Sequence, residues 1–396
     1  MPLEPTWRWF GPQDPISLKE IRQTGAAGIV TALHHIPTGE VWSVEEVAKR
    51  KAEIASAGMR WSVVESLPVH EDIKKRSGRY RQYTENYKQS LHNLGGCGID
   101  TVCYNFMPVL DWSRTDLHVE YEDGSITTRF ESTVFAAFDL YLLNRTNAVK
   151  DYGEEQLGKA EQYFRNLNND QKQRLAQTVL LGLPGSLEGY TLEGLREAVR
   201  QYDGIGEHEL RNNLCSFIKD IVPEAEKAGV RMAIHPDDPP WSLLGLPRVL
   251  SNSEDVRRIL EVIDTPSNGI TLCTGSFGAG HANDLVEMAI RFAHRINFIH
   301  LRNVSRNEDG DFLEEDHLDG DIDMYGVMKA LVLEQKRRED EGRKGRRIPF
   351  RPDHGHLMIP DTLKQGVYPG YSLFGRMRGL AELRGLELGI RRSLEL

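Results

Sequence analysis

Residues 230–240 read VRMAIHPDDPP, a short apolar run that ends in His235 and passes at once into proline and aspartate. The same arrangement recurs three times further along the chain. GITLC ends at Cys273, INFIH ends at His300 and IPFRPD ends at Asp353, and turn-forming or polar residues follow each run. Short apolar runs rich in β-branched and aromatic residues are typical of parallel strands buried on both faces. The pattern therefore predicts four buried strands, each with a possible metal ligand at its end.

Four similar runs precede these, and helical patterns lie between the runs. The predicted strands are 6–10, 28–33, 60–66, 101–106, 230–235, 269–274, 296–301 and 348–352. The predicted helices are 17–25, 43–58, 83–98, 251–264, 283–295 and 323–339. Several of these helices open with Ser or Asp and several close on Gly, as capped helices do. Alternating strands and helices predict an α/β fold with a parallel sheet, whose commonest eightfold form is the closed (β/α)8 TIM barrel.

The segment between the predicted fourth and fifth strands is much longer than the others. Helical patterns occur within it at 153–167 and 170–183. We therefore expect one barrel domain over 1–396 with a helical insertion at 113–228. Because the insertion follows a strand, it emerges on the face where barrel enzymes keep their active sites, and we expect it to cap the pocket. A surface excursion that covers nothing is the alternative.

Length and composition limit the class of protein. A chain of 396 residues can bury a large core, and its four cysteines are too few for a disulfide scaffold, which favours a reducing compartment. The N-terminal residues do not have the pattern of a signal peptide, and the sequence has no apolar run long enough to span a membrane. A net charge of -10 disfavours nucleic acid and anionic membrane as partners. We expect a soluble cytoplasmic protein.

The four strand-end residues make up a plausible metal site. His235, Cys273, His300 and Asp353 offer two imidazoles, a thiolate and a carboxylate. Imidazole and thiolate suit zinc and late first-row metals, and the carboxylate also admits Mn²⁺ or Fe²⁺. Taken singly, each residue could be a hydrogen-bonded or buried core residue. Taken together, coordination of one ion would satisfy all four, because buried His and Asp must be paired.

Long motifs around these residues resemble the D-mannonate dehydratases of hexuronate degradation almost from end to end. The motifs are TWRWFGPQDP (6–15), TALHHIPTGEVWSVEE (31–46), VVESLPVHEDI (63–73), TVCYNFMPVLDWSRTD (101–116), MAIHPDDPP (232–240), CTGS (273–276), HLR (300–302) and RPDHGH (351–356). The resemblance implies a xylose-isomerase-like barrel that uses Mn²⁺ or Fe²⁺ to convert D-mannonate into 2-dehydro-3-deoxy-D-gluconate and water, in glucuronate catabolism. It also implies a homo-oligomer such as a dimer. The segments 277–285 and 304–321 depart from the family pattern.

Carried onto this sequence, the family's metal ligands are the same four residues, His235, Cys273, His300 and Asp353. The family's acid/base pair matches His354, in RPDHG, and Tyr371, in PGYS. Dehydration removes a proton at C2 and hydroxide at C3, so it needs a base and an acid. Imidazole, with a pKa near ~6.5, suits the base, and a phenol near ~10 suits the donor. The reverse assignment stays open.

Other polar residues at the strand ends are candidates for substrate binding. Arg302 and Arg351 could pair with the substrate carboxylate or form structural ion pairs at the barrel mouth. Asn105 and His35 could hydrogen-bond to substrate hydroxyls. Three other functions compete with the dehydratase: a metal-dependent sugar isomerase, a DNA-repair nuclease and a structural metal protein. The negative charge argues against the nuclease, and the wide spacing of the ligands argues against a closed structural site.

Overall fold

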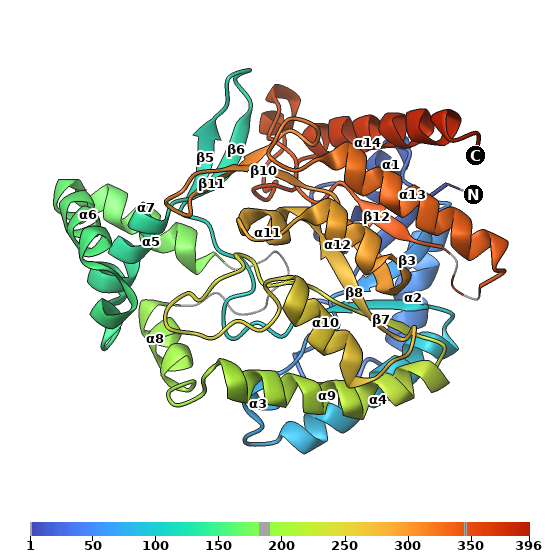
Figure 1. Cartoon of the computed structure of the whole chain (residues 1–396), viewed down its shortest axis with the longest axis horizontal. Coiled ribbons are helices and arrows are strands. Elements are labelled where there is room, and N and C mark those ends of the chain that lie inside the picture. Colours follow the sequence, from blue (N-terminus) through green and yellow to red (C-terminus); the bar gives the residue numbers. More distant parts are fainter. Residues whose placement is uncertain (1, 182–190, 344, 346) are drawn as a thin grey trace.

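Eight parallel strands form a closed barrel in the computed structural model, which describes residues 2–181, 191–343, 345 and 347–396 (Figure 1). Around the barrel the strands follow the order β1-β12-β9-β8-β7-β4-β3-β2. They are β1 (Glu4–Arg8), β2 (Gly28–Thr31), β3 (Arg60–Glu65), β4 (Thr101–Tyr104), β7 (Arg231–Ile234), β8 (Asn268–Cys273), β9 (Ile296–His300) and β12 (Pro349–Arg351). Parallel pairing between β1 and β12 closes the barrel. The predicted TIM barrel and its eight strands are confirmed.

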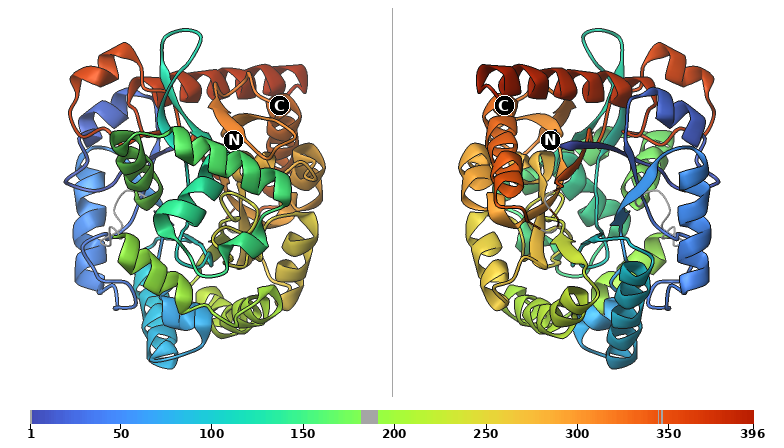
Figure 2. Two further views of the ribbon diagram at one scale, coloured as in Figure 1. Left: turned by 90° about the vertical axis from the view of Figure 1, so that its left-hand side faces the viewer. Right: turned by 90° about the vertical axis from the view of Figure 1, so that its right-hand side faces the viewer.

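Helices surround the barrel (Figure 2). They are α1 (Leu18–Gln23), α2 (Val44–Ser56), α3 (Glu71–Lys75), α4 (Tyr80–Gly96), α9 (Glu207–Lys227), α10 (Ser253–Val262), α11 (Thr274–Ala279), α12 (Leu285–Arg291), η3 (Ala293–Arg295), α13 (Met324–Asp340) and α14 (Phe374–Ser393). All six predicted helices are present, and the side chains of Ser17 and Ser43 cap α1 and α2 as expected. The predictions did not include α9, which contains Pro223, or α14, which contains four glycines. Proline and glycine both weaken a helical pattern in sequence.

Two of the α14 glycines allow the helix to lie close to the site loop. A Cβ atom at Gly375 would lie 1.9 Å from the His356 carbonyl oxygen, and one at Gly379 would lie 2.1 Å from the His317 ring. A side chain at Gly375 would push α14 away from the loop that carries RPDHGH. One at Gly379 would collide with His317, whose Nε2 lies 2.7 Å from the Pro352 carbonyl oxygen of that loop. The glycines that conceal the helix in sequence are therefore the residues that let it pack here.

The insertion after β4 is not only helical. It opens with a hairpin of β5 (Asp116–Glu120) and β6 (Ile126–Phe130), which joins β10 (Asn303–Arg306) and β11 (Phe312–Glu315) in a four-stranded sheet of order β10-β11-β6-β5. We call this the accessory sheet. The insertion continues with α5 (Ser132–Ala137), η1 (Phe138–Leu143), η2 (Ala148–Asp151), α6 (Glu154–Asn166), α7 (Asn169–Leu180) and α8 (Leu192–Arg200). Its residues 182–190, which include the predicted end of the 170–183 helix, lie outside the described residues.

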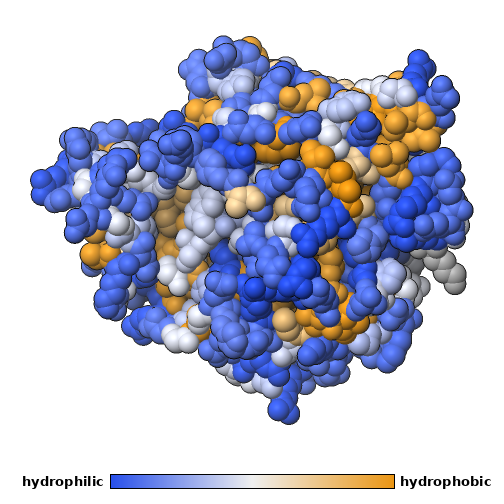
Figure 3. Space-filling model, in the orientation of Figure 1, coloured by the Kyte–Doolittle hydropathy of each residue, from blue (hydrophilic) through white to orange (hydrophobic). Residues whose placement is uncertain are grey.

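The insertion lies in front of the barrel when the molecule is viewed from the left-hand side of Figure 1, as the left panel of Figure 2 shows. The barrel interior is filled by Val30, Val63, Cys103, Ala233 and Phe298, which form a small separate cluster. Cys103 is thus a packing residue, as expected. The face shown in Figure 3 is mostly hydrophilic. None of the helices in the described part of the chain is long and apolar enough to cross a membrane.

Candidate metal centre and active site

Four adjacent barrel strands deliver the four predicted metal ligands to one place. Cys273 and His300 end β8 and β9 and are paired in register across the two strands. His235 follows β7 directly, and Asp353 follows β12 by two residues. Since β7, β8, β9 and β12 are consecutive around the barrel, their carboxyl ends meet at one edge. The hydrogen-bond register of the barrel therefore sets the spacing of these side chains.

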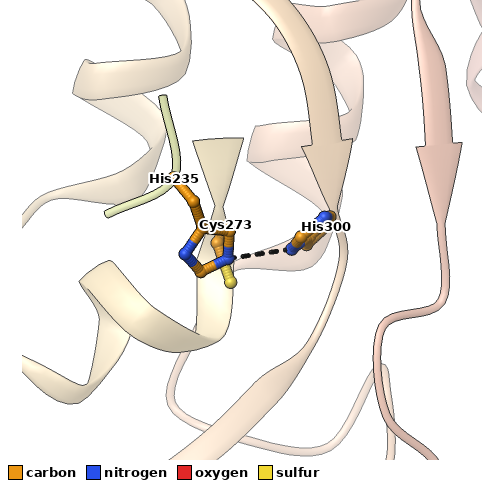
Figure 4. Close-up of side chains that lie close together, drawn as sticks. All are labelled: His235, Cys273 and His300. Atoms are coloured by element: carbon orange, nitrogen blue, oxygen red, sulfur yellow. Dashed lines mark hydrogen bonds between the residues drawn. The ribbon is translucent and has the colours of Figure 1, made fainter. Parts of the chain in front are cut away.

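Three of the four form a compact group that could hold a metal ion (Figure 4). The ligand atoms of His235, Cys273 and His300 all lie within 4.8 Å of one another. Nε2 of His235 lies 3.1 Å from Nδ1 of His300. Nδ1 of His235 lies 2.7 Å from the Pro236 carbonyl oxygen, so the proton belongs on Nδ1 and Nε2 keeps its lone pair. That is the hydrogen bond that orients a metal-binding histidine.

Asp353 lies beside this group and is also engaged with arginines. Its Oδ2 is 3.6 Å from Cys273 Sγ and its Oδ1 is 3.8 Å from His300 Nδ1. The Arg351 guanidinium donates to Asp353, and that of Arg302 lies 3.4 Å away. Burial alone would raise the pKa of Asp353, but the neighbouring cationic groups, Arg351 first among them, hold it well below its usual range. The carboxylate is therefore ionised next to two imidazoles and a thiol.

The predicted acid/base pair lies next to the predicted metal ligands. His354 adjoins Asp353 in the chain, and Tyr371 comes from the loop between η4 (Ile359–Leu363) and α14. The two rings meet edge to face with centroids 5.0 Å apart, and both side chains are buried. The loop is fixed there because the Gly355 backbone N–H donates to the Gly370 carbonyl at 2.9 Å. Burial raises the pKa of Tyr371 to about 12, so its phenol stays protonated at neutral pH.

The two arginines predicted to bind substrate are held by buried carboxylates. Arg351 donates to both carboxylate oxygens of Glu65, at 3.0 and 2.8 Å. Arg302 donates to Asp238 at 2.7 Å. Burial would raise the pKa of Glu65, but Arg351 and His300 lower it well below its usual value. These pairs correspond to the structural ion pairs that the sequence left open. Arg302 and Arg351 also line a pocket with His235, His354 and Tyr371, which we call the inner pocket.

Asn105 and His35 lie in two different cavities. Asn105 lines the inner pocket with His235 and His354. His35 is an exposed residue hydrogen-bonded to Glu46 at 2.8 Å, and it lines a neighbouring cavity of 610 Å³. Tyr371 lines both cavities. The structure thus places Asn105 in the inner pocket and His35 in the adjoining cavity.

Two buried carboxylates and one arginine in the site were not assigned any role from the sequence. Glu314, on β11, hydrogen-bonds His354, and Asp238 pairs with Arg302. Arg114, at the start of the insertion, is fully buried between them and bonds to both. Asp238 lies in the quoted HPDDPP motif, but Glu314 lies within 304–321, where the chain departs from the family pattern. Burial in a strand is what distinguishes Glu314 from a solvated acidic residue.

Comparison with known proteins identifies relatives over the whole chain. The family model described as D-mannonate dehydratase (UxuA) matches residues 3–395. A mannonate dehydratase of Marinomonas sp. (strain MWYL1) is 55% identical over 393 residues, which cover 99% of this chain and 100% of the relative. A mannonate dehydratase of Saccharophagus degradans is 52% identical over 384 residues, covering 97% of each chain.

A solved structure gives the same result. The crystal structure of mannonate dehydratase from Streptococcus suis serotype 2 superposes with a TM-score of 0.77 at 36% sequence identity. The match covers 99% of this chain and 95% of that one. The likeness therefore includes the barrel together with its additions, since both chains are covered almost completely.

Proposed function

The chain belongs to the D-mannonate dehydratase family, and from that membership and the geometry of the pocket we propose that it dehydrates D-mannonate to 2-dehydro-3-deoxy-D-gluconate. The observation that carries the proposal is that His235, one of the clustered metal-ligand candidates, lines the same pocket as the buried His354 and Tyr371. Relatives that match over their full length are named dehydratases, which favours this reaction over the sugar-isomerase alternative.

The donor set supports a single divalent cation held by His235, Cys273 and His300, with Asp353 as a fourth ligand. We propose Mn²⁺ or Fe²⁺, because the family resemblance implies these ions and the carboxylate suits them. A bound cation would stabilise the negative charge that develops on the substrate as the C2 proton leaves. The charged neighbours of Asp353 keep it ionised, and only the ionised form is a good ligand.

We assign the base to His354 and the acid to Tyr371. His354 accepts the proton from C2, and the released electron pair forms the C2–C3 double bond. As the C3–O bond breaks, Tyr371 donates its proton to the departing oxygen, which leaves as water. The raised pKa of Tyr371, about 12, supports its role as donor because the phenol is protonated when the substrate binds.

Two proton movements then restore the enzyme and complete the product. The enol formed by the elimination loses its hydroxyl proton and gains one at C3, which gives the 2-keto acid. The proton held by His354 passes to the Tyr371 phenolate, whose ring meets the His354 ring edge to face. Each turnover thus leaves both residues in their starting forms.

The test is formation of the keto-deoxy acid from D-mannonate by chelated protein, with and without added Mn²⁺. We expect no product after chelation and recovery when Mn²⁺ or Fe²⁺ is added. D-mannose, offered in parallel, separates dehydration from isomerisation: ketose formed from D-mannose with no keto-deoxy acid formed from D-mannonate would overturn the proposal.

Three expectations beyond the reaction stay predictions. We propose that the insertion at 113–228 caps the pocket, a role supported by buried Arg114, which donates to Glu314 and to Asp238. We also propose a cytoplasmic location, in keeping with a metabolic enzyme. A dimer is expected from the family resemblance, and sedimentation velocity would test it.

A further inference from the structure

We propose that Glu314 is a positioning residue that holds His354 in the tautomer with its proton on Nδ1 and so leaves Nε2 to accept the substrate proton. Its importance for turnover rests on the proposed role of His354 as base. The tautomer itself is a property of the resting protein and can be measured without any reaction.

The contacts of His354 Nδ1 decide which tautomer is stable. Both carboxylate oxygens of Glu314 approach this nitrogen, at 2.9 and 2.8 Å. An Arg302 N–H also lies 3.3 Å away and could donate to an unprotonated Nδ1. That alternative would set the lone pair of Nδ1 against an ionised carboxylate at hydrogen-bond distance. The shorter contact to the carboxylate therefore requires a proton on Nδ1.

Glu314 can play this part because it is itself held ionised and fixed. Its side chain is buried, and the Arg114 Nε donates to Oε1 at 3.1 Å. The guanidinium of Arg114 also lies over the Trp112 and Phe312 rings, 4.9 and 4.7 Å from their centroids. Burial would raise the pKa of Glu314, but His354, Arg114 and Arg302 together bring it far below its usual value.

The other ring nitrogen is left free for chemistry. Nε2 of His354 makes no hydrogen bond to any residue in the described part of the chain, and the Asp353 Oδ1 atom lies 3.9 Å from it. The edge-to-face contacts with Trp112 and Tyr371 limit rotation of the ring. An imidazole fixed on one side by a carboxylate and open on the other is the arrangement in which histidine acts as a general base.

The inference assigns a role to the accessory sheet. Glu314 lies on β11, which pairs with β6 of the insertion hairpin through Phe312–Phe130 and Leu313–Arg129. The Thr127 hydroxyl on β6 donates to the Glu314 carbonyl at 2.7 Å. Two additions to the barrel, one after β4 and one after β9, thus combine to bring a carboxylate behind the catalytic histidine.

Nitrogen NMR of the wild-type protein tests the tautomer directly. Protein labelled with ¹⁵N-histidine and loaded with diamagnetic Zn²⁺ would show 13 imidazoles, and the His354→Asn variant identifies the signals of His354. We expect a protonated Nδ1 and an unprotonated Nε2. A proton found on Nε2 of the neutral ring would overturn the proposal, whether or not the protein turns over D-mannonate.

Kinetics of a matched pair of variants test the consequence. Glu314→Gln removes the charge behind His354, whereas Glu315→Gln changes the next residue, which faces the other way and bonds to the Tyr121 hydroxyl at 2.5 Å. We expect Glu314→Gln to lower kcat by about 100-fold, within the range of general-base contributions, with KM and bound metal nearly unchanged. Glu315→Gln should stay close to wild type. Equal kcat values for the two variants would overturn the proposal.

A third variant separates this inference from the proposed function. If His354→Asn retains normal dehydration of D-mannonate, the assignment of His354 as base fails. The NMR result would still stand or fall by itself. If His354→Asn is inactive and Glu314→Gln is fully active, the proposed function survives and the positioning role is overturned.

Discussion

His235, Cys273 and His300 stand at the ends of three adjacent barrel strands, whereas His354 is held mainly from outside the barrel, by Glu314 on the accessory sheet and by Tyr371 in a loop. The first group is spaced by backbone register, so the same sheet that closes the barrel also brings the ligands together. The second depends on side-chain contacts between segments far apart in sequence. Substitutions on the two sides of the pocket should therefore impair different properties of the protein.

This difference separates ion binding from proton transfer. Loss of a strand-end ligand should release the ion and leave the acid/base residues in place. Loss of an acid/base residue should leave the ion bound and stop the reaction. Stability should respond to a third set, the buried arginines and carboxylates that lie between the two sides.

The largest effect is expected from Cys273→Ser, set against Cys103→Ser. Cys273 is one of the three clustered donors, while Cys103 lies in the barrel interior with its Sγ 3.4 Å from the Thr271 hydroxyl. We expect Cys273→Ser to lose its metal, measured by elemental analysis, and to lower activity by more than about 10³-fold. Cys103→Ser should keep its metal and its activity, because the serine hydroxyl can replace the thiol in the hydrogen bond with Thr271. Equal metal contents in the two variants would remove Cys273 from the ligand set.

The next effect concerns the acid/base side and distinguishes its two members. His354→Asn and Tyr371→Phe should each lower dehydration of D-mannonate by about 10²- to 10⁴-fold with metal retained. A 3-deoxy-3-fluoro substrate should restore much of the rate of Tyr371→Phe, because fluoride needs less help from an acid than hydroxide. The fluoro substrate should not restore the rate of His354→Asn, because that variant lacks the proposed base. The opposite pattern would make Tyr371 the base.

The contrast between the two sides also explains what the sequence could reveal. His235, Cys273 and His300 were predictable because buried parallel strands have a strong apolar pattern, and a polar residue at the end of such a strand stands out. Glu314 could not be predicted as a site residue, because the sequence DFLEEDHL is typical of an acidic loop. Only pairing with β6 shows that Phe312 and Glu314 share a buried face.

The hairpin that makes this pairing has a local signal in the sequence. Asp123-Gly124 separates two runs of alternating side chains, a typical mark of a hairpin, and Gly124 has a φ of +80°. The longer helical patterns at 153–167 and 170–183 predict a helical insertion, so the two short strands are not expected. No local pattern contains the pairing of β11 with β6, because the two strands come from insertions that lie far apart in the sequence.

A smaller but measurable effect is expected on stability from Arg351→Met. Arg351 bonds to both oxygens of buried Glu65, so its removal leaves that carboxylate uncompensated. We expect the free energy of unfolding to fall by about 3–5 kcal/mol. Arg257→Met is the control: it breaks pairs with Glu254 and Glu261 on the surface of α10 and should cost less than about 1 kcal/mol. Similar losses in both would mean that Arg351 is not a structural ion-pair residue.

The smallest effects compare two glycines of the insertion. At Gly124 an alanine would meet no atom within 4 Å, so only the positive φ penalises it. Gly124→Ala should therefore destabilise the protein by about 1 kcal/mol. Gly158 lies in α6 with equally open space and no positive φ, so Gly158→Ala should stabilise it by about 0.5–1 kcal/mol. Denaturant unfolding measures both. If the hairpin supports Glu314 as proposed, Gly124→Ala should also lower kcat slightly, whereas Gly158→Ala should not; a loss of rate in both would show that the insertion acts on the site as a whole.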